Sequence, residues 1–343
     1  MIKILHGADL HLDSPFSSLP REQAVRQRDL QRQLPKRLVQ LANERQCDLL
    51  LLAGDVFDSD TVYPETVQAL CDALAMCRCR VFIAPGNHDP YTEQSVWAKL
   101  TLPSHVHVFS APYECVTLEE LGCRVHGGAF LEHSCYEPIP MVEKQGYLEI
   151  GVFHGEIAAE SFYRGIDKEE ILACNMDYLA LGHIHKVSFP RRLGNTWFGW
   201  PGVTMGRGFD ELGSCGALYV QLDGERCAAE FVAMENPVYT VLTVPPGELP
   251  QILPGSESIH CRMRLVGQTA PPDIEKLQNL YAPHYASLEI VDETEPLQDL
   301  WEGIGDGTLR GLALEQLRAC PDESLSDLAA KYLIAALEGR EAP

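Results

Sequence analysis

Short apolar runs recur along the first half of the chain, at residues 2–5, 49–53, 81–84, 149–153 and 178–181. The runs are too short and too continuously apolar for amphipathic helices, so they predict strands that are buried on both faces. Amphipathic helical patterns lie between them at 36–45 and 64–76, and the second of these begins with a proline. Strands that alternate with helices predict an α/β layered core.

Two later segments, 107–130 and 190–234, are rich in strand signals, and Asp223-Gly224 has the composition of a hairpin turn. They predict a second mixed β-sheet stacked on the first. After residue 236 the patterns follow in the order strand, strand, helix, strand, which predicts a small α/β unit. We therefore expect three parts: a large domain at 1–235, a small capping or accessory domain at 236–300 and a helical segment at 301–343.

An amphipathic helix is predicted near 324–339. Its apolar residues recur at helical spacing, at Leu325, Leu328, Ala329, Tyr332, Leu333, Ala336 and Leu337. Such a face must be buried, either against the chain's own core or in a groove on a partner protein.

Composition narrows the class of protein. A chain of 343 residues with 45% hydrophobic content can bury one large core and a smaller one. It has no apolar run of 18 residues and no signal-peptide pattern at its start, so we expect a soluble, cytoplasmic protein without a membrane segment. Its 12 cysteines have no C-x-x-C spacing, and we expect them to be reduced and mostly buried.

The formal net charge of −22 argues against a protein that wraps nucleic acid with its own basic surface. Segment 21–45 is the exception, because it carries seven Lys or Arg against three Asp or Glu. Three interpretations are open: a solvated helix face, a local binding surface for phosphates or an acidic partner, or a contact in a homodimer.

Side chains able to bind a metal follow each of the five apolar runs. They are Asp9 and His11, Asp55 and Asp58, Asn87 with His88 and Asp89, His154, and His183 with His185. Ligands of open α/β sheets collect outside the carboxyl ends of the strands, so these groups are expected to share one cleft. Carboxylate, imidazole and one amide oxygen suit manganese, iron or zinc, and the set is large enough for two ions that share a carboxylate.

Each group alone has a simpler explanation as a turn, a capped loop or a buried core histidine. Five such groups, in order at successive strand ends, favour a site instead. The histidines outside these groups are expected to be structural or exposed, and they are His6, His105, His107, His126, His133, His260 and His284. His126 is the notable one, since it ends a strand and precedes two glycines.

The order D-x-H, G-D-x-x-D, G-N-H-D, a single His and G-H-x-H resembles the signature of the calcineurin-like metallophosphoesterases, and the resemblance spans residues 1–235. The contexts GADLHLDSPF, AGDVFDSD and DYLALGHIHK resemble the DNA-repair exonuclease branch of SbcD and Mre-eleven nucleases. The stretch WPGVTMGRGFDELGSCG is similar to that family's tyrosine-proline-glycine-serine segment. It departs from it with Trp200 and Val203, so the substrate contacts of that segment are not carried over.

The resemblance implies two stacked mixed β-sheets flanked by helices, a four-layer sandwich. It implies one ion held by Asp9, His11 and His185, another held by Asn87, His154 and His183, and Asp55 as the bridge between them. His88, with Asn87, would face the substrate as a catalytic group, and Asp89 would hold the His88 ring. Asp58 would either support the site from behind or cap its loop. Manganese is the preferred metal, with iron or zinc as alternatives.

Two such ions lower the pKa of a bridging water, so that hydroxide at neutral pH can attack a phosphodiester in line. The resemblance implies a DNA exonuclease or endonuclease subunit of an SbcCD-like repair complex, joined through C-terminal helices to an SbcC-like coiled-coil ATPase. The alternative is a phosphoesterase for cyclic nucleotides, dinucleoside polyphosphates or phosphoproteins. A metal-binding scaffold without activity is a third hypothesis, and the intact ligand set counts against it.

Overall fold

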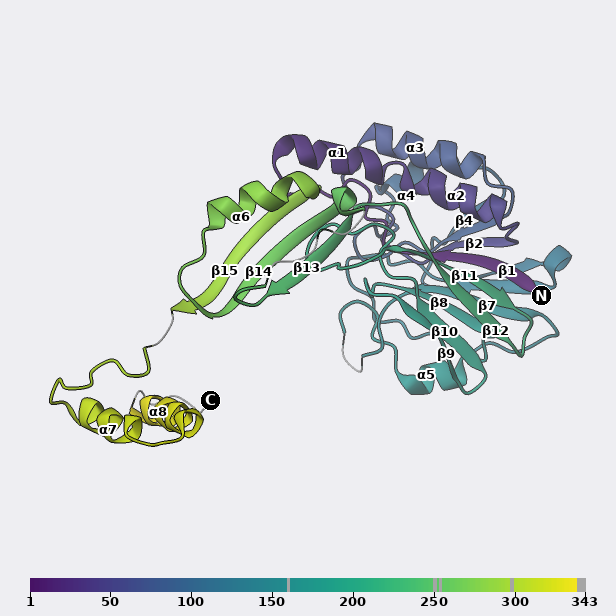
Figure 1. Cartoon of the computed structure of the whole chain (residues 1–343). Coiled ribbons are helices and arrows are strands. Elements are labelled where there is room, and N and C mark those ends of the chain that lie inside the picture. The colour runs from purple at the N-terminus through teal and green to yellow at the C-terminus, as the bar shows by residue number, and fades with distance from the viewer. Residues whose placement is uncertain (159–160, 249–251, 253–254, 297–298, 338–343) are drawn as a thin grey trace. The chain divides into compact units, whose positions relative to one another are not determined.

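The computed structural model describes residues 1–158, 161–248, 252, 255–296 and 299–337. Contacts divide the chain into two compact units (Figure 1). The first unit comprises Met1–Val241, Leu253–Arg262 and Pro283–Ser287, and the second holds the other described residues from Leu242 onward. The expected cap, 236–300, thus contributes residues to both units.

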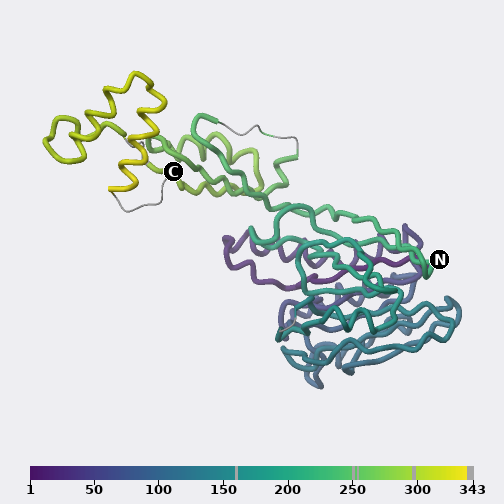
Figure 2. Tube along the Cα trace, turned by 90° about the horizontal axis from the view of Figure 1, so that it is seen from below, coloured from purple at the N-terminus to yellow at the C-terminus, as the bar shows by residue number. Residues whose placement is uncertain are grey.

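The first unit contains two six-stranded sheets. In the first sheet β1 to β4 run parallel, β11 pairs antiparallel with β1, and β12 pairs antiparallel with β11. Figure 2 shows the N-terminus beside the green β11–β12 segment, where Ile2 pairs with Leu222. The sheet order is β12 (Cys227–Ala233), β11 (Gly216–Leu222), β1 (Ile2–Gly7), β2 (Leu49–Leu52), β3 (Arg80–Ile83) and β4 (Val106–Val108).

The second sheet has a parallel centre with one antiparallel strand at each edge. Its order is β5 (Glu114–Leu118), β6 (Cys123–Gly127), β7 (Leu148–His154), β8 (Tyr178–Gly182), β10 (Thr196–Trp200) and β9 (Ser188–Leu193). The predicted strands, the second sheet and the hairpin turn at Asp223-Gly224 are confirmed.

Helices cover the first sheet on the side away from the second sheet. They are α1 (Arg21–Gln31), α2 (Leu34–Glu44) and α3 (Pro64–Ala75). The first unit has two shorter helices as well, α4 (Val96–Lys99) and α5 (Lys168–Ala173). Alternate residues of β2 explain its unbroken LLLL sequence, because Leu50 and Leu52 pack with the helices whereas Leu49 and Leu51 pack between the sheets. The outer face of the second sheet is covered by α5 and by Ile139 and Val142. The four-layer mixed α/β fold is therefore confirmed.

A three-stranded sheet follows the layered core, in the order β13 (Val238–Val244), β14 (Ile259–Thr269) and β15 (Ser287–Pro296), with α6 (Ile274–Tyr281) between β14 and β15 in the chain. The order strand, strand, helix, strand is the one that the sequence predicts. Short 3₁₀ turns lie at Glu119–Leu121, Ser256–Ser258 and Ala282–His284.

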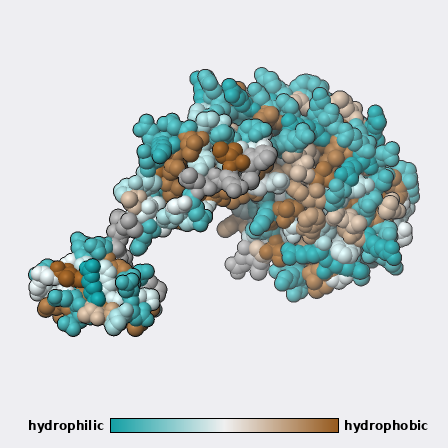
Figure 3. Space-filling view, viewed as in Figure 1, coloured by the Kyte–Doolittle hydropathy of each residue, from teal (hydrophilic) through white to brown (hydrophobic). Residues whose placement is uncertain are grey.

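The last described elements, α7 (Leu309–Arg318) and α8 (Glu323–Leu337), form a helical hairpin. Ala330 and Ile334 of α8 pack with Leu314 of α7, whereas Leu325, Leu328, Tyr332 and Leu337 are about half exposed. Figure 3 shows apolar side chains at the hairpin surface among hydrophilic ones. The face expected to be buried therefore lies largely outward, because α8 is apolar on two sides and α7 covers only one.

Among the residues that the structure describes, no helix is long and apolar enough to cross a lipid bilayer. The 12 cysteines are free thiols, and eight of them are buried.

Candidate metal centre

The carboxyl ends of β1, β2, β3, β7 and β8 bring the predicted ligands of two sheets together. Ligand atoms of Asp9, His11 and His185 lie within 4.8 Å of one another, and so do those of Asp9, Asp55 and His154. Asp9 and Asp55 are almost fully buried. Two carboxylates and three imidazoles therefore converge in one small volume.

The ring orientation of His154 leaves one nitrogen free to bind a metal. Its Nδ1–H donates to the carbonyl of Ala53 at 2.9 Å, so Nε2 carries the lone pair of the neutral ring. That Nε2 lies 3.0 Å from Asn87 Oδ1 and 3.3 Å from Asp55 Oδ2. Three electron-rich atoms at these distances repel one another unless a proton or a cation lies between them.

His11 and His185 are held in the same way. His11 Nδ1–H donates to Asp58 Oδ1 at 3.1 Å, and His185 Nδ1–H donates to Glu211 Oε1 at 2.9 Å. Their two Nε2 atoms then face each other at 3.3 Å, and His185 Nε2 lies 4.0 Å from Asp9 Oδ1. Such an approach requires a proton or a cation between the two nitrogens, and a shared metal ion would supply it.

Asp55 lies between the two groups of ligands. Its Oδ2 is 3.3 Å from His154 Nε2 and 3.8 Å from His11 Nε2, so it is within reach of both groups. Gly86 makes room for it, because a Cβ on Gly86 would overlap the Asp55 carboxylate. The glycine of GNHD is therefore needed for close packing against the ligand.

His183 lies at the edge of this group. Its backbone N–H donates to the Asp9 carboxylate at 3.1 Å, and its ring centroid is 5.1 Å from that of His154. Its Nε2 is 3.9 Å from Glu156 Oε1, and no metal-competent trio among the described residues includes it. The assignment of His183 as a ligand stays a prediction.

Four of the predicted ligands have left-handed backbone conformations, with φ values of 50° at Asp9, 46° at His11, 50° at Asp55 and 91° at His183. Residues other than glycine adopt this region at a cost, and such strain concentrates at functional sites. The strand ends therefore turn sharply to aim these side chains inward.

Asp89 does not hold His88 as expected. Its carboxylate accepts hydrogen bonds from the backbone N–H groups of Val56, Phe57 and Gly86, at 2.8 to 3.1 Å. The His88 ring is oriented instead by Nδ1–H donating to the Asp58 carbonyl at 2.9 Å. Asp89 therefore fixes the loop that carries Asp55, and its role is that of a loop anchor.

Arg207 and Glu211 are the functional residues that the sequence interpretation missed. Glu211 is buried and binds both His185 and Arg207, and Arg207 Nη1 donates to Asp58 Oδ1 at 3.0 Å. Asp58 in turn orients His11, so its expected supporting role has a partner. Both lie in the stretch WPGVTMGRGFDELGSCG, whose resemblance to the family segment pointed to neither residue.

Burial and charge shift the pKa values of these groups in opposite directions. Burial raises the pKa of Asp9 to about 6, with a further contribution from the charge of Asp55. Burial disfavours the His154 imidazolium, but the neighbouring Asp55 carboxylate outweighs it and raises the pKa of His154 to about 9. Burial likewise opposes the charged form of Glu211, yet His185 and Arg207 lower its pKa to about 2. The buried carboxylates thus favour positive charge at the place where the ions would bind.

A cavity of about 530 Å³ adjoins His183 and His185. Residues 201–203 and 210–212 also line it, from the stretch whose substrate contacts were left open. Val203, at the position where the resemblance leads us to expect a small hydroxyl residue, is buried and apolar. Space for a substrate group therefore exists beside the ligands, without a hydroxyl at that position.

Of the remaining histidines, His133 contacts the Asn87 carbonyl through Nδ1 at 2.8 Å, whereas His126 and His6 make contacts away from the predicted ligands. His126 binds Glu149 at 2.8 Å and the Tyr113 hydroxyl at 3.0 Å, in a buried cluster at the edge of the second sheet. His6 donates to the Leu181 carbonyl and accepts from the Tyr178 hydroxyl. Both contacts are structural, as the sequence predicts.

The basic segment 21–45 uses much of its charge within the chain. Arg28, Arg32, Arg37 and Arg45 each bind an oxygen of the protein itself, at 2.6 to 3.0 Å. These bonds favour a solvated, structural helix face.

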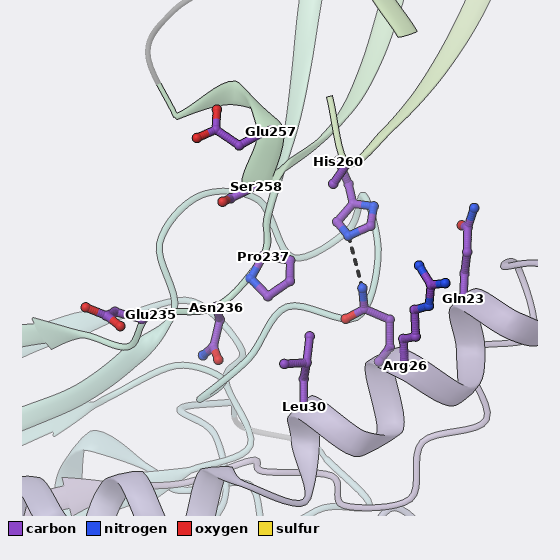
Figure 4. Close-up of a pocket in the computed structure, with 11 residues that line it drawn as sticks. Gln23, Arg26, Leu30, Glu235, Asn236, Pro237, Glu257, Ser258 and His260 are labelled. Carbon is purple, nitrogen blue, oxygen red and sulfur yellow. Dashed lines mark hydrogen bonds between the residues drawn. The ribbon is translucent and has the colours of Figure 1, made fainter. Parts of the chain in front are cut away.

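A second cavity, of about 770 Å³, opens beside α1 (Figure 4). Arg26 and Leu30 of α1 line it together with Pro237 and His260. The side-chain amide of Gln27 donates a hydrogen bond to His260 Nε2 at 3.1 Å, which the figure marks at the His260 ring. Glu235 and Glu257 also line the cavity, so Arg26 does not give it the charge of a phosphate site.

The model of a family described as calcineurin-like phosphoesterase matches residues 2–187. A relative described as an uncharacterized metallophosphoesterase, YhaO of Bacillus subtilis (strain 168), is 28% identical over 255 residues, which cover 67% of this chain and 60% of the relative. The chain therefore spans less than two thirds of that relative's length.

Two solved structures are similar at low identity. TT1561 of Thermus thermophilus is 15% identical with a TM-score of 0.41, over 67% of this chain and 98% of that one. Yfce, a phosphoesterase from E. coli, is 16% identical with a TM-score of 0.34, over 67% and 99% of the two chains.

Proposed function

Because the chain belongs to the calcineurin-like phosphoesterase family, we propose that it is a phosphodiesterase with two divalent metal ions, and that its substrate is DNA. The observation that carries the metal-dependent part is the inward-facing set of Nε2 atoms. His11, His154 and His185 each have Nδ1–H bound to an oxygen behind the ring, so the lone pairs point at Asp9 and Asp55.

The donor set fits two ions of the manganese, iron or zinc type. Asp9, His11 and His185 would hold one, Asn87, His154 and His183 the other, and Asp55 would bridge them. When bound, two such ions activate water and neutralise charge that develops on the phosphorus oxygens.

The chain's own residues complete the site. His88 is exposed, and its Nδ1–H bond to the Asp58 carbonyl leaves Nε2 turned away from the loop. That nitrogen can donate a proton to the departing oxygen or a hydrogen bond to the phosphate. Arg207 and Glu211 keep the rings of His11 and His185 in place through Asp58 and by direct contact.

The choice of DNA rests on the similarity of the motif contexts to the SbcD and Mre-eleven nucleases. The net charge of −22 favours the second candidate, a phosphoesterase for small substrates, since polyanionic DNA is repelled by an acidic surface. A partner with a basic surface, such as an SbcC-like ATPase, would remove this difficulty. The exposed face of α8 at Leu325, Leu328 and Tyr332 supports attachment of such a partner.

The test is hydrolysis of single- and double-stranded DNA with manganese, run beside bis-p-nitrophenyl phosphate and cyclic nucleotides. His88→Ala should retain metal and lose turnover, whereas His284→Ala, at an exposed histidine outside the motifs, should behave as the wild type. Turnover of the small esters with no cleavage of any DNA, even with the partner added, would reject the nuclease proposal. Loss of metal from His88→Ala would reject the role given to His88.

A further inference from the structure

Three large aromatic side chains are exposed on two loops of the first unit. Tyr136 is 68% exposed, Phe162 69% and Tyr163 42%. The rings of Tyr136 and Phe162 are in edge contact, with centroids 6.3 Å apart. Contiguous exposed apolar side chains on a folded domain commonly belong to binding surfaces.

The two loops that carry the cluster are joined by hydrogen bonds beneath it. The Cys135 N–H donates to the Phe162 carbonyl and the Arg164 N–H to the Cys135 carbonyl, both at 2.9 Å. The guanidinium of Arg164 is buried between Phe130 and Phe153, and its Nε and Nη2 donate to the Cys135 sulfur. The rings are thus presented on a fixed backbone, which lowers the entropy lost when a ligand stacks on them.

The cluster continues into the metal centre. The centroid of the Tyr163 ring lies 5.2 Å from that of His183. His133, on the same loop as Tyr136, contacts the Asn87 carbonyl through Nδ1 at 2.8 Å. A substrate that reaches from the centre to these loops would pass over the aromatic rings.

Unpaired nucleobases are ligands that suit this aromatic cluster. Bases are planar and uncharged, so they can stack on aromatic rings even though the protein carries a net charge of −22. We propose that Tyr136, Phe162 and Tyr163 form a stacking platform for the bases of single-stranded DNA whose phosphodiester lies at the metal centre. This inference rests on the proposed function and names the form of DNA that the site accepts.

The test compares a ten-residue oligothymidylate with an abasic oligomer of the same length and charge, using the full chain loaded with manganese. The wild type should bind and cleave the base-bearing oligomer about tenfold better. Tyr136→Ala and Phe162→Ala should lose that preference without changing hydrolysis of the abasic oligomer, and Phe162→Trp should keep it. Phe189→Ala, at an exposed phenylalanine of β9, is the matched control and should keep the preference.

Binding measured by fluorescence anisotropy separates this inference from the proposed function. Suppose that neither oligomer is cleaved, but the wild type binds the base-bearing oligomer more tightly than the abasic one and Phe162→Ala does not. The nuclease proposal then fails and the platform stands. Equal binding of the two oligomers by the wild type overturns the platform. So does a change in oligomeric state in Phe162→Ala with an unchanged base preference, because the cluster would then be an interface between protein chains.

Discussion

At the residue scale, the centre depends on which nitrogen of each histidine faces inward. The partners behind the rings, Asp58, Glu211 and the Ala53 carbonyl, decide this. Such partners commonly matter almost as much as the ligands themselves.

Glu211→Ala should weaken manganese binding by about 10- to 100-fold, because the His185 ring loses the acceptor that orients it. Glu211→Gln should recover part of the loss, since its amide oxygen can still accept from Nδ1–H. Asp210→Asn is the matched control at the neighbouring exposed acid. Calorimetric titration with manganese checks the affinities, and an unchanged value in Glu211→Ala would contradict the role given to Glu211.

Burial of His6 should make the stability of the folded chain sensitive to acid. Burial lowers its pKa from the ordinary 6.5 to about 3, despite the hydrogen bond to Leu181. Between these two values the unfolded chain binds a proton that the folded chain does not, so His6 lowers stability by about 1.4 kcal/mol for each pH unit of acidification.

His6→Gln should therefore reduce the slope of unfolding free energy against pH, between pH 6.5 and about 3, by that amount. At neutral pH the same substitution lowers stability, because it disturbs a buried contact. Urea unfolding at a series of pH values measures the slope. His284→Gln, at an exposed position, should leave the slope as it is in the wild type.

At the element scale, the last helix shows that a one-dimensional pattern does not determine which apolar face packs within the chain. The heptad-like spacing of Leu325, Leu328 and Tyr332 is regular, yet α7 packs against the face of Ala330 and Ile334. The choice depends on the position of α7, which the pattern within α8 does not contain.

Ile334→Ala should destabilise the hairpin by about 2 kcal/mol or more, because it opens a cavity in the small core between α7 and α8. Leu328→Ala should change its stability by less than about 0.5 kcal/mol, since Leu328 is about half exposed. Hydrogen exchange of the hairpin amides distinguishes the two, because it detects local opening. Equal protection in both variants would show that the assigned face is wrong.

At the scale of the whole molecule, the metals are expected to hold the two sheets together. The predicted ligands follow β1, β2 and β3 of the first sheet and β7 and β8 of the second, so ions at the centre would join strands of two sheets that share no hydrogen bonds. The buried, mutually repelling carboxylates of Asp9 and Asp55 otherwise face each other.

Removal of metal by a chelator should therefore lower the thermal stability of the protein. At a metal concentration about 100 times the dissociation constant, binding stabilises the folded state by about 3 kcal/mol per ion. Calorimetry with and without manganese measures the difference in melting temperature. That difference should be smaller in Asp9→Asn than in the wild type. The same melting temperature in chelator and in manganese would contradict a preformed centre.

Much of the fold and the membership of the centre follow from the sequence by itself. Strands buried on both faces need unbroken apolar runs, and a parallel strand ends where its polar residues begin, so LLLLAGD and VFIAPGNHD already place Asp55 and Asn87 at one edge of a sheet. These features are local, because they depend on a strand and the turn after it.

The tertiary structure alone decided which groups touch across long distances in the chain. The bond that Arg207 donates to Asp58, the bond that the Val56 N–H donates to Asp89 and the apolar packing of α7 on the inner face of α8 depend on how separate segments come together. The aromatic cluster of Tyr136 and Phe162 is of the same kind, since two loops with no regular pattern are joined by backbone bonds at Cys135. No periodicity or motif records such contacts, because each is set by where another part of the chain comes to lie.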